Sequence, residues 1–227
     1  MSRRGPIEDN EWPEKLKSHV VTAGAAPRIH GYLVESDLAK HYRFTDTALL
    51  ALTGELPSEA EGAAFDVAMT FLAPLSVAEA PAHAAALARV CGARSSAILA
   101  AAAITLAERA RFIVAQCGKL LDWLAAPDDA LDPSIEAQGE EDRVAVQALR
   151  DALARRHVDI EVLAKPLSRE AALVATLWFA GLRRPEQVET ALVMASLPTV
   201  VAEAHCHDVA SFREYPIKLP PFEYEDP

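Results

Sequence analysis

The alanine-rich segment SSAILAAAAITLAERARFIVAQ occupies residues 95–116. From Ser95 to Ala126, just before Pro127, the chain contains no proline and a single glycine, Gly118. Alanine has the highest helix propensity of all residues, and its small side chain lets a second helix approach closely. The segment therefore predicts one long helix, capped by Ser95 or Ser96, that lies at the centre of the fold or at an interface.

The composition of the whole chain favours the same class of structure. Its 227 residues suffice for one domain with a sizeable core. Hydrophobic residues make up 51% of the chain, but aromatic residues only 6%. A core built from Ala, Leu and Val favours closely packed helices over a sandwich of sheets. We therefore predict an all-α fold.

Local signals place several helix ends. Thr45 is predicted to cap a helix that stops at Gly54, and Ser58 with Glu61 forms a capping box for a helix ending near Leu72. Further helices are predicted to begin at Pro81, at Ser168 and at Pro185 and to include RVAVQALRDALARR at 143–156. Only the β-branched, turn-rich segment at 19–34 predicts short strands.

The domain organisation follows from where these signals stop. Residues 1–15 are polar and carry two prolines, which predicts a flexible N-terminal arm. Residues 16–210 form the helical domain, interrupted by an acidic, turn-rich loop at about 127–142. The proline-rich residues 211–227 predict an extended C-terminal tail.

Charge and cysteine usage exclude several functions. The net charge of −11 repels phosphate backbones, so we expect no nucleic-acid partner. No apolar run is long enough to span a membrane, and the N-terminus lacks the apolar core of a secretory signal. Three widely spaced cysteines are typical of reduced thiols, so we expect a cytoplasmic protein. We expect no metal site, because the sequence His-Cys-His-Asp at 205–208 has no second ligand pair to complete it.

Residues 30–61, HGYLVESDLAKHYRFTDTALLALTGELPSEAE, resemble citrate synthases and citryl-CoA lyases. The family's glycine-tyrosine step is Gly31-Tyr32, its leucine-rich helix contains Leu49-Leu50, and its Gly-Glu-Leu-Pro turn is 54–57. The similarity continues through AHAAALARVCGA and the alanine-rich segment, and so covers about residues 15–115. The resemblance implies the family's large helical domain, with the small domain largely deleted, and dimerisation through the alanine-rich helices.

The family follows its alanine-rich helix with Gly-Pro-Leu-His-Gly-Gly-Ala-Asn, whose histidine polarises the carbonyl of an acyl-CoA or its product. In this chain, Phe112 takes the histidine's place, Ile113 and Val114 take the glycines, and Ala110 takes the proline. Each replacement favours a helix where the family has a turn. We therefore predict that the helix continues through residues 109–114.

Other family positions have also changed. Asp159, in RHVDI, is similar to the family's catalytic aspartate, although a surface or helix-start aspartate is the alternative. Leu197 and Leu219 replace substrate-binding arginines, whereas Tyr224 is retained. Leucine cannot form the bidentate carboxylate clamp that arginine provides, and Phe112 cannot donate a proton. His83 is a candidate ligand contact, with a packed histidine as the alternative.

Three hypotheses follow. The first is a catalytically degenerate citrate synthase-like protein with no cofactor, which acts as a structural or regulatory homodimer or as a heteromeric partner of an active citrate synthase-like paralogue. The second is a rebuilt citrate synthase-like acyltransferase or citryl-CoA lyase that acts on a CoA or carrier-bound thioester. It has Asp159 and either His83 or His157 as acid and base, which meet in one cleft within about 3 Å of each other, directly or through one water. The third is an unrelated helical interaction domain, which predicts a different fold.

Overall fold

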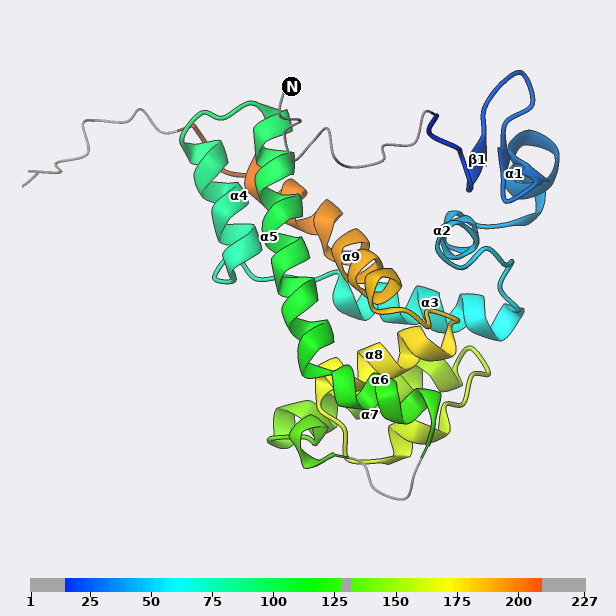
Figure 1. The fold of residues 1–227 in the computed structure, drawn as a ribbon. Coiled ribbons are helices and arrows are strands. Elements are labelled where there is room, and N and C mark those ends of the chain that lie inside the picture. Colours follow the sequence, from blue (N-terminus) through cyan, green and yellow to red (C-terminus); the bar gives the residue numbers. More distant parts are fainter. Residues whose placement is uncertain (1–14, 128–131, 210–227) are drawn as a thin grey trace, which may run out of the picture.

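The computed structural model describes residues 15–127 and 132–209, and helices dominate them (Figure 1). The described elements, in chain order, are β1 (Val21–Thr22), β2 (Arg28–Ile29), β3 (Tyr32–Leu33), η1 (Val34–Leu38), α1 (Ala39–His41), α2 (Phe44–Thr53), α3 (Glu59–Leu72), α4 (Ala80–Val90), α5 (Ser95–Gln116), α6 (Gly118–Ala125), η2 (Pro133–Ile135), α7 (Glu140–Ala154), η3 (Glu161–Ala164), α8 (Arg169–Phe179) and α9 (Pro185–His205). The three two-residue strands form an antiparallel sheet in the order β1-β2-β3.

Helices α4, α5 and α9 pack against one another at one end of the molecule (Figure 1). Their shared core consists mainly of small side chains, namely Ala82, Ala85, Ile98, Ala102, Leu106, Val200 and Ala204. The alanines let the helix axes approach closely. The predicted central position of the alanine-rich helix is therefore confirmed, since α5 contacts both of its neighbours along this core.

A second, larger core lies where α3, α6, α7 and α8 meet, below the α4–α5 pair in Figure 1. Phe65 of α3 is its largest fully buried side chain, and Leu177 of α8 is also completely buried. The C-terminal part of α5 contributes Ile113 and Val114 to this core. Helix α5 thus connects the two cores.

Several predicted helix ends are confirmed. The Ser58 amide donates to Glu61 Oε2 at 2.8 Å, and the Glu61 amide donates to Ser58 Oγ at 3.3 Å, which is a capping box. Gly54 ends α2 with φ of 88°, a left-handed conformation that favours glycine. Ser168 caps α8 and Pro185 is the first residue of α9, as predicted.

Other boundaries differ from the prediction. Helix α2 begins at Phe44 rather than after Thr45, because Asp46 accepts from the Arg43 amide at 2.9 Å and so caps the helix. The acidic loop is shorter than predicted, since α7 begins at Glu140. Residues 128–131 of that loop, nearly all of the predicted N-terminal arm and the C-terminal tail with Leu219 and Tyr224 lie outside the described residues.

The long helix predicted from Ser95 to Ala126 is two helices. Helix α5 ends at Gln116, and Cys117 has φ −88° and ψ 7°, which is not helical. Helix α6 then leaves in a new direction from Gly118 (Figure 1). Glycine lowers helix stability, and the turn lets α6 bury Leu120 and Leu121 in the larger core.

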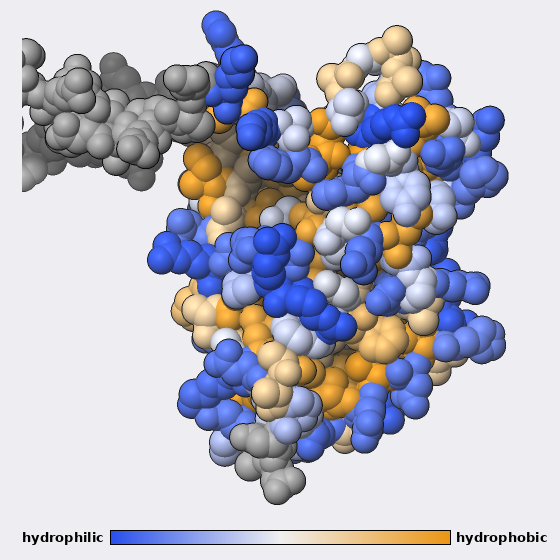
Figure 2. Space-filling model, turned by 45° about the vertical axis from the view of Figure 1, so that its right-hand side comes forward, coloured by the Kyte–Doolittle hydropathy of each residue, from blue (hydrophilic) through white to orange (hydrophobic). Residues whose placement is uncertain are grey.

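The surface alternates between hydrophilic and apolar patches. Figure 2 shows hydrophilic side chains surrounding apolar ones on one face. The exposed large apolar side chains include Ile104 and Phe112 of α5 and Val144 of α7. Among the described residues, no helix combines the length and the apolar character that a membrane span requires.

Candidate functional site

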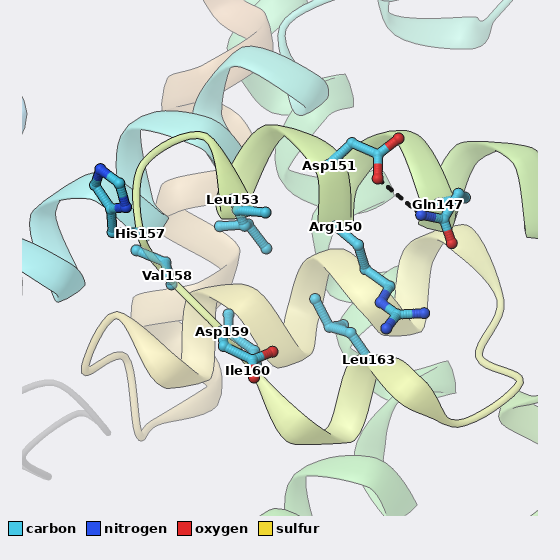
Figure 3. Close-up of a pocket in the computed structure, with 10 residues that line it drawn as sticks. Gln147, Arg150, Asp151, Leu153, His157, Val158, Asp159, Ile160 and Leu163 are labelled. Atoms are coloured by element: carbon cyan, nitrogen blue, oxygen red, sulfur yellow. Dashed lines mark hydrogen bonds between the residues drawn. The ribbon is translucent and has the colours of Figure 1, made fainter.

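A cavity of about 350 Å³ lies between the C-terminal half of α7 and the short helix η3 (Figure 3). Its floor is apolar and belongs to the larger core, because Leu153, Val158, Ile160 and Leu163 are all less than 10% exposed. Its rim is polar and contains Gln147, Arg150, Asp151, His157 and Asp159. Two of the three predicted acid and base residues, His157 and Asp159, therefore line one cavity.

The polar groups of the rim differ in what they bind. Gln147 Nε2 donates to Asp151 Oδ1 at 2.8 Å. Arg150 and Asp159, by contrast, take part in none of the ion pairs or side-chain hydrogen bonds found among the described residues. Figure 3 shows their charged groups on either side of Leu163. The cavity thus presents a guanidinium and a carboxylate that are both available to a ligand.

His157 occupies a backbone conformation that favours glycine. Its φ is 58°, and it is the left-handed residue that ends the turn after the C-terminus of α7. The Val158 amide donates to the Leu153 carbonyl at 3.0 Å, and the His157 amide donates to the Ala154 carbonyl at 3.0 Å. These two hydrogen bonds define a Schellman motif, whose left-handed residue is usually glycine.

Replacing His157 by glycine is expected to raise the free energy of unfolding by about 0.5–1 kcal/mol, because glycine relieves the left-handed strain but adds entropy to the unfolded chain. Urea unfolding measures the change. Arg155→Gly is the matched control, since Arg155 has an ordinary helical φ of −61°, and it should destabilise instead. A destabilised His157→Gly variant would show that the imidazole contributes more than the strain costs.

The predicted acid and base side chains do not converge on one point. His83 lies on α4 and is exposed, at the opposite end of the molecule from α7 in Figure 1, so the alternative of a packed histidine is wrong. His157 shares the cavity with Asp159, but Figure 3 shows its ring directed away from the Asp159 carboxylate. No hydrogen bond or ion pair joins either histidine directly to Asp159 in the described structure, and a contact through one water stays a prediction.

The helix does continue through the position of the family's catalytic turn, as predicted. Residues 109–114 lie within α5, which is unbroken from Ser95 to Gln116. Phe112 is 62% exposed, whereas Ile113 and Val114 are each 6% exposed. Where the family has histidine followed by two glycines, this chain has a surface phenylalanine followed by two core residues.

Leu197 lines an apolar groove. The groove has a volume of about 430 Å³ and lies between α5 and α9, where Ala107, Val193 and Met194 form its other apolar walls. Only Glu189 and Thr190 add polar groups to it. The position that the resemblance assigns to a substrate-binding arginine therefore contributes to an apolar surface.

A second, charged cleft was not predicted. Glu79, Arg109, Arg169 and Glu170 meet beside Ile113, where the ends of several helices converge, and the cleft holds only about 50 Å³. Arg109 donates from Nε to Glu79 Oε2 at 3.2 Å, and Arg169 donates from Nη2 to the Phe71 carbonyl at 3.3 Å. Its cations are therefore occupied by the protein itself. These side chains come from separate segments with no common spacing, so the sequence carries no signal for the cleft.

A further cavity, of about 420 Å³, adjoins this cleft and shares Glu170 with it. Its lining includes Cys117, which is 4% exposed. Burial raises the pKa of the Cys117 thiol to about 11, and the negative charge of Glu170 adds to the increase. The thiol is therefore protonated and unreactive at neutral pH.

The Cys117 thiol should make stability fall with pH in the alkaline range. Between the ordinary pKa of 9.0 and about 11, the unfolded chain loses the thiol proton while the folded chain keeps it, so the free energy of unfolding decreases. Urea unfolding across this range should show a steeper decrease for the wild type than for Cys117→Ala. Equal slopes would contradict the raised pKa. Cys91 and Cys206 are exposed and are present in both the wild type and Cys117→Ala, so they do not account for a difference between the two slopes.

Comparisons with known proteins identify the fold. The chain matches no family model and no curated protein. Its structure is similar to that of citryl-CoA lyase from Hydrogenobacter thermophilus, with a TM-score of 0.66 and 17% sequence identity. The match covers 96% of this chain and 96% of the lyase chain. The resemblance found in the sequence is therefore confirmed at the level of the fold, since this chain has an all-α fold similar to that of citryl-CoA lyase.

Proposed function

We propose that this protein is a catalytically degenerate relative of the citrate synthases and citryl-CoA lyases, and that it acts as a dimeric structural or regulatory subunit, either with itself or with an active relative. The observation that carries the proposal is the unbroken course of α5 through residues 109–114. A helix places Phe112 on the surface and provides no glycine-rich backbone for close approach of a ligand.

The small size and internal pairing of the charged cleft beside Ile113 support the proposed lack of catalytic activity. Ligand sites for small molecules usually measure about 300–1,000 Å³, whereas this cleft holds about 50 Å³. Arg109 is paired with Glu79, so it is not available to a substrate carboxylate. Losing one hydrogen-bond donor to a developing oxyanion typically costs about 3–4 kcal/mol of transition-state stabilisation, and this chain lacks several of the family's groups together.

The exposed face of α5 supports association. Ile104 is 66% exposed and Leu99 is 46% exposed, and the apolar groove beside Leu197 continues this surface onto α9. Large exposed apolar side chains that gather near a groove are typical of interaction sites. A two-fold axis beside α5 would bury the same patch on both copies.

Activity measurements test the first half of the proposal. We expect no cleavage of citryl-CoA and no condensation of acetyl-CoA with oxaloacetate above the uncatalysed rate, with an active citryl-CoA lyase as the positive control. Calorimetric titration with acetyl-CoA, oxaloacetate and citrate should give no saturable heat with the folded protein. Turnover, or saturable binding of any of the three at micromolar concentration, would overturn the proposal.

Analytical ultracentrifugation tests the second half. We expect a dimer at micromolar concentration, alone or after mixing with a citrate synthase-like paralogue, and we expect Ile104→Glu to weaken self-association at least about 100-fold by burying an unpaired charge. Val144→Glu is the matched control, because Val144 is 60% exposed on α7 and should leave association unchanged. A monomer under all these conditions would contradict the proposed role.

A second candidate function is the rebuilt acyltransferase or lyase, which would act on a CoA or carrier-bound thioester. His157 and Asp159 line one cavity, and because no hydrogen bond joins the two side chains directly, this candidate needs a water molecule between them. It predicts thioester turnover that Asp159→Asn abolishes and that Glu161→Gln, an exposed neighbour outside the cavity lining, leaves intact. The cytoplasmic location stays a prediction.

A further inference from the structure

The cavity between α7 and η3 combines three features that point to a ligand. Its floor is fixed, because Leu153 and Leu163 are 1% and 2% exposed and belong to the larger core. Its volume of about 350 Å³ lies within the range of small-molecule sites, which is about 300–1,000 Å³. Its rim carries the Arg150 guanidinium and the Asp159 carboxylate, which no other part of the described protein binds.

The backbone of His157 is a fourth, independent feature. The residue holds a left-handed conformation at the rim of the cavity, at a place where glycine would be less strained. Strained residues of this kind gather at binding sites, where the side chain has a role that outweighs the strain.

The charges of the cavity define the class of ligand. Arg150 supplies one positive charge and Asp151 and Asp159 supply two negative ones, so the rim is net negative when the imidazole is neutral. Such a rim repels di- and tricarboxylates, which are strongly anionic. A ligand that satisfies both free groups needs a carboxylate for the guanidinium and a cationic donor for Asp159.

We propose that this cavity binds a small zwitterion with an apolar body, such as an α-amino acid with a branched aliphatic side chain. The carboxylate of the ligand pairs with Arg150, and its ammonium group donates to Asp159. The aliphatic side chain packs on the floor formed by Leu153, Val158 and Leu163. This site is separate from the proposed dimer surface on α5. It includes Asp159, which resembles the family's catalytic aspartate, but the proposal does not rest on the proposed function.

Three probes of matched shape test the two charges separately. L-Leucine carries both charges, 3-methylbutylamine lacks the carboxylate, and 4-methylpentanoate lacks the ammonium group. In calorimetric titrations of the full-length protein, leucine should bind with a Kd of about 1 mM or tighter and at least about tenfold more tightly than either analogue. No saturable heat with leucine, or equal binding of the three probes, would overturn the proposal.

Two variants test which residue binds each charged end of the ligand. Arg150→Met should remove the preference for leucine over 3-methylbutylamine, and Asp159→Asn should remove the preference for leucine over 4-methylpentanoate. Arg156→Met and Glu161→Gln are matched controls, because both residues are exposed and neither lines the cavity. Circular dichroism confirms that each variant is folded. Unchanged leucine affinity in both Arg150→Met and Asp159→Asn would place the ligand elsewhere and refute the proposal.

Discussion

Replacing Ile113 and Val114 together by glycine is expected to lower the free energy of unfolding by about 5–8 kcal/mol. Both side chains are 6% exposed and pack into the larger core. Truncating a buried isoleucine to alanine costs about 2–5 kcal/mol, and a buried valine costs somewhat less. Each glycine adds about 0.5–1 kcal/mol through the helix. Because domains are stable by only about 5–15 kcal/mol, the variant should be largely unfolded near physiological temperature.

Urea unfolding followed by circular dichroism measures this loss. Phe112→His is the matched control, because Phe112 is 62% exposed and the change should alter stability by less than about 1 kcal/mol. Near-wild-type stability of the double glycine variant would show that residues 109–114 can leave the helix at little cost. In that case the packing of α5 would not prevent the family's turn, and the residues at these positions alone would explain its loss.

The burial of residues 113 and 114 also limits which variants could regain activity. In this chain the positions of the two family glycines are filled by core residues, so histidine at position 112 alone cannot recreate the turn. We expect Phe112→His to show no citryl-CoA cleavage, because the imidazole would stand on the solvent-facing side of a helix. The proposed degeneracy therefore depends on the packing of α5 as well as on one side chain.

The sequence predicted those parts of the fold that depend on local chemistry. Ser58 with Glu61, Gly54 and Pro185 mark helix ends through hydrogen bonds, a left-handed φ and a fixed φ that neighbouring residues alone determine. The fold itself was predicted from motifs in order along the chain, and the structural similarity over 96% of both chains confirms it.

What the sequence did not reveal depends on packing between distant segments. Helix α5 ends at Gln116 because the following residues turn to bury Leu120, and propensity alone favours continuation. Glu79 and Arg109 are 30 residues apart and meet only when α5 packs beside the start of α4. The sequence did not predict the left-handed conformation of His157, because such a position is usually marked by glycine and this chain has histidine there.

Gly62 leaves room at the contact between α2 and α3 for the Arg43–Asp46 ion pair, whose carboxylate is buried and whose guanidinium is half exposed. Filling this space is expected to have the second large effect on stability. A Cβ atom at Gly62 would lie 2.7 Å from Asp46 Oδ1 and 3.0 Å from Arg43 Nη2. Asp46 is 7% exposed, and its Oδ2 accepts from the Arg43 amide at 2.9 Å, so the carboxylate is fixed by the cap of α2. Arg43 also pairs with Asp66 of α3.

Gly62→Val is therefore expected to lower the free energy of unfolding by about 2–4 kcal/mol, through overpacking and through partial loss of the Arg43–Asp46 hydrogen bonds. Ala60→Val is the matched control, because Ala60 is exposed in the first turn of the same helix and the change should cost less than about 0.7 kcal/mol. The stability of Gly62→Ala should lie between those of the two valine variants, since the higher helix propensity of alanine offsets part of the cost of the close contact. If Gly62→Val unfolds at the same urea concentration as Ala60→Val, then α2 and α3 separate without cost, and the ion pair does not hold the N-terminal helices to the core.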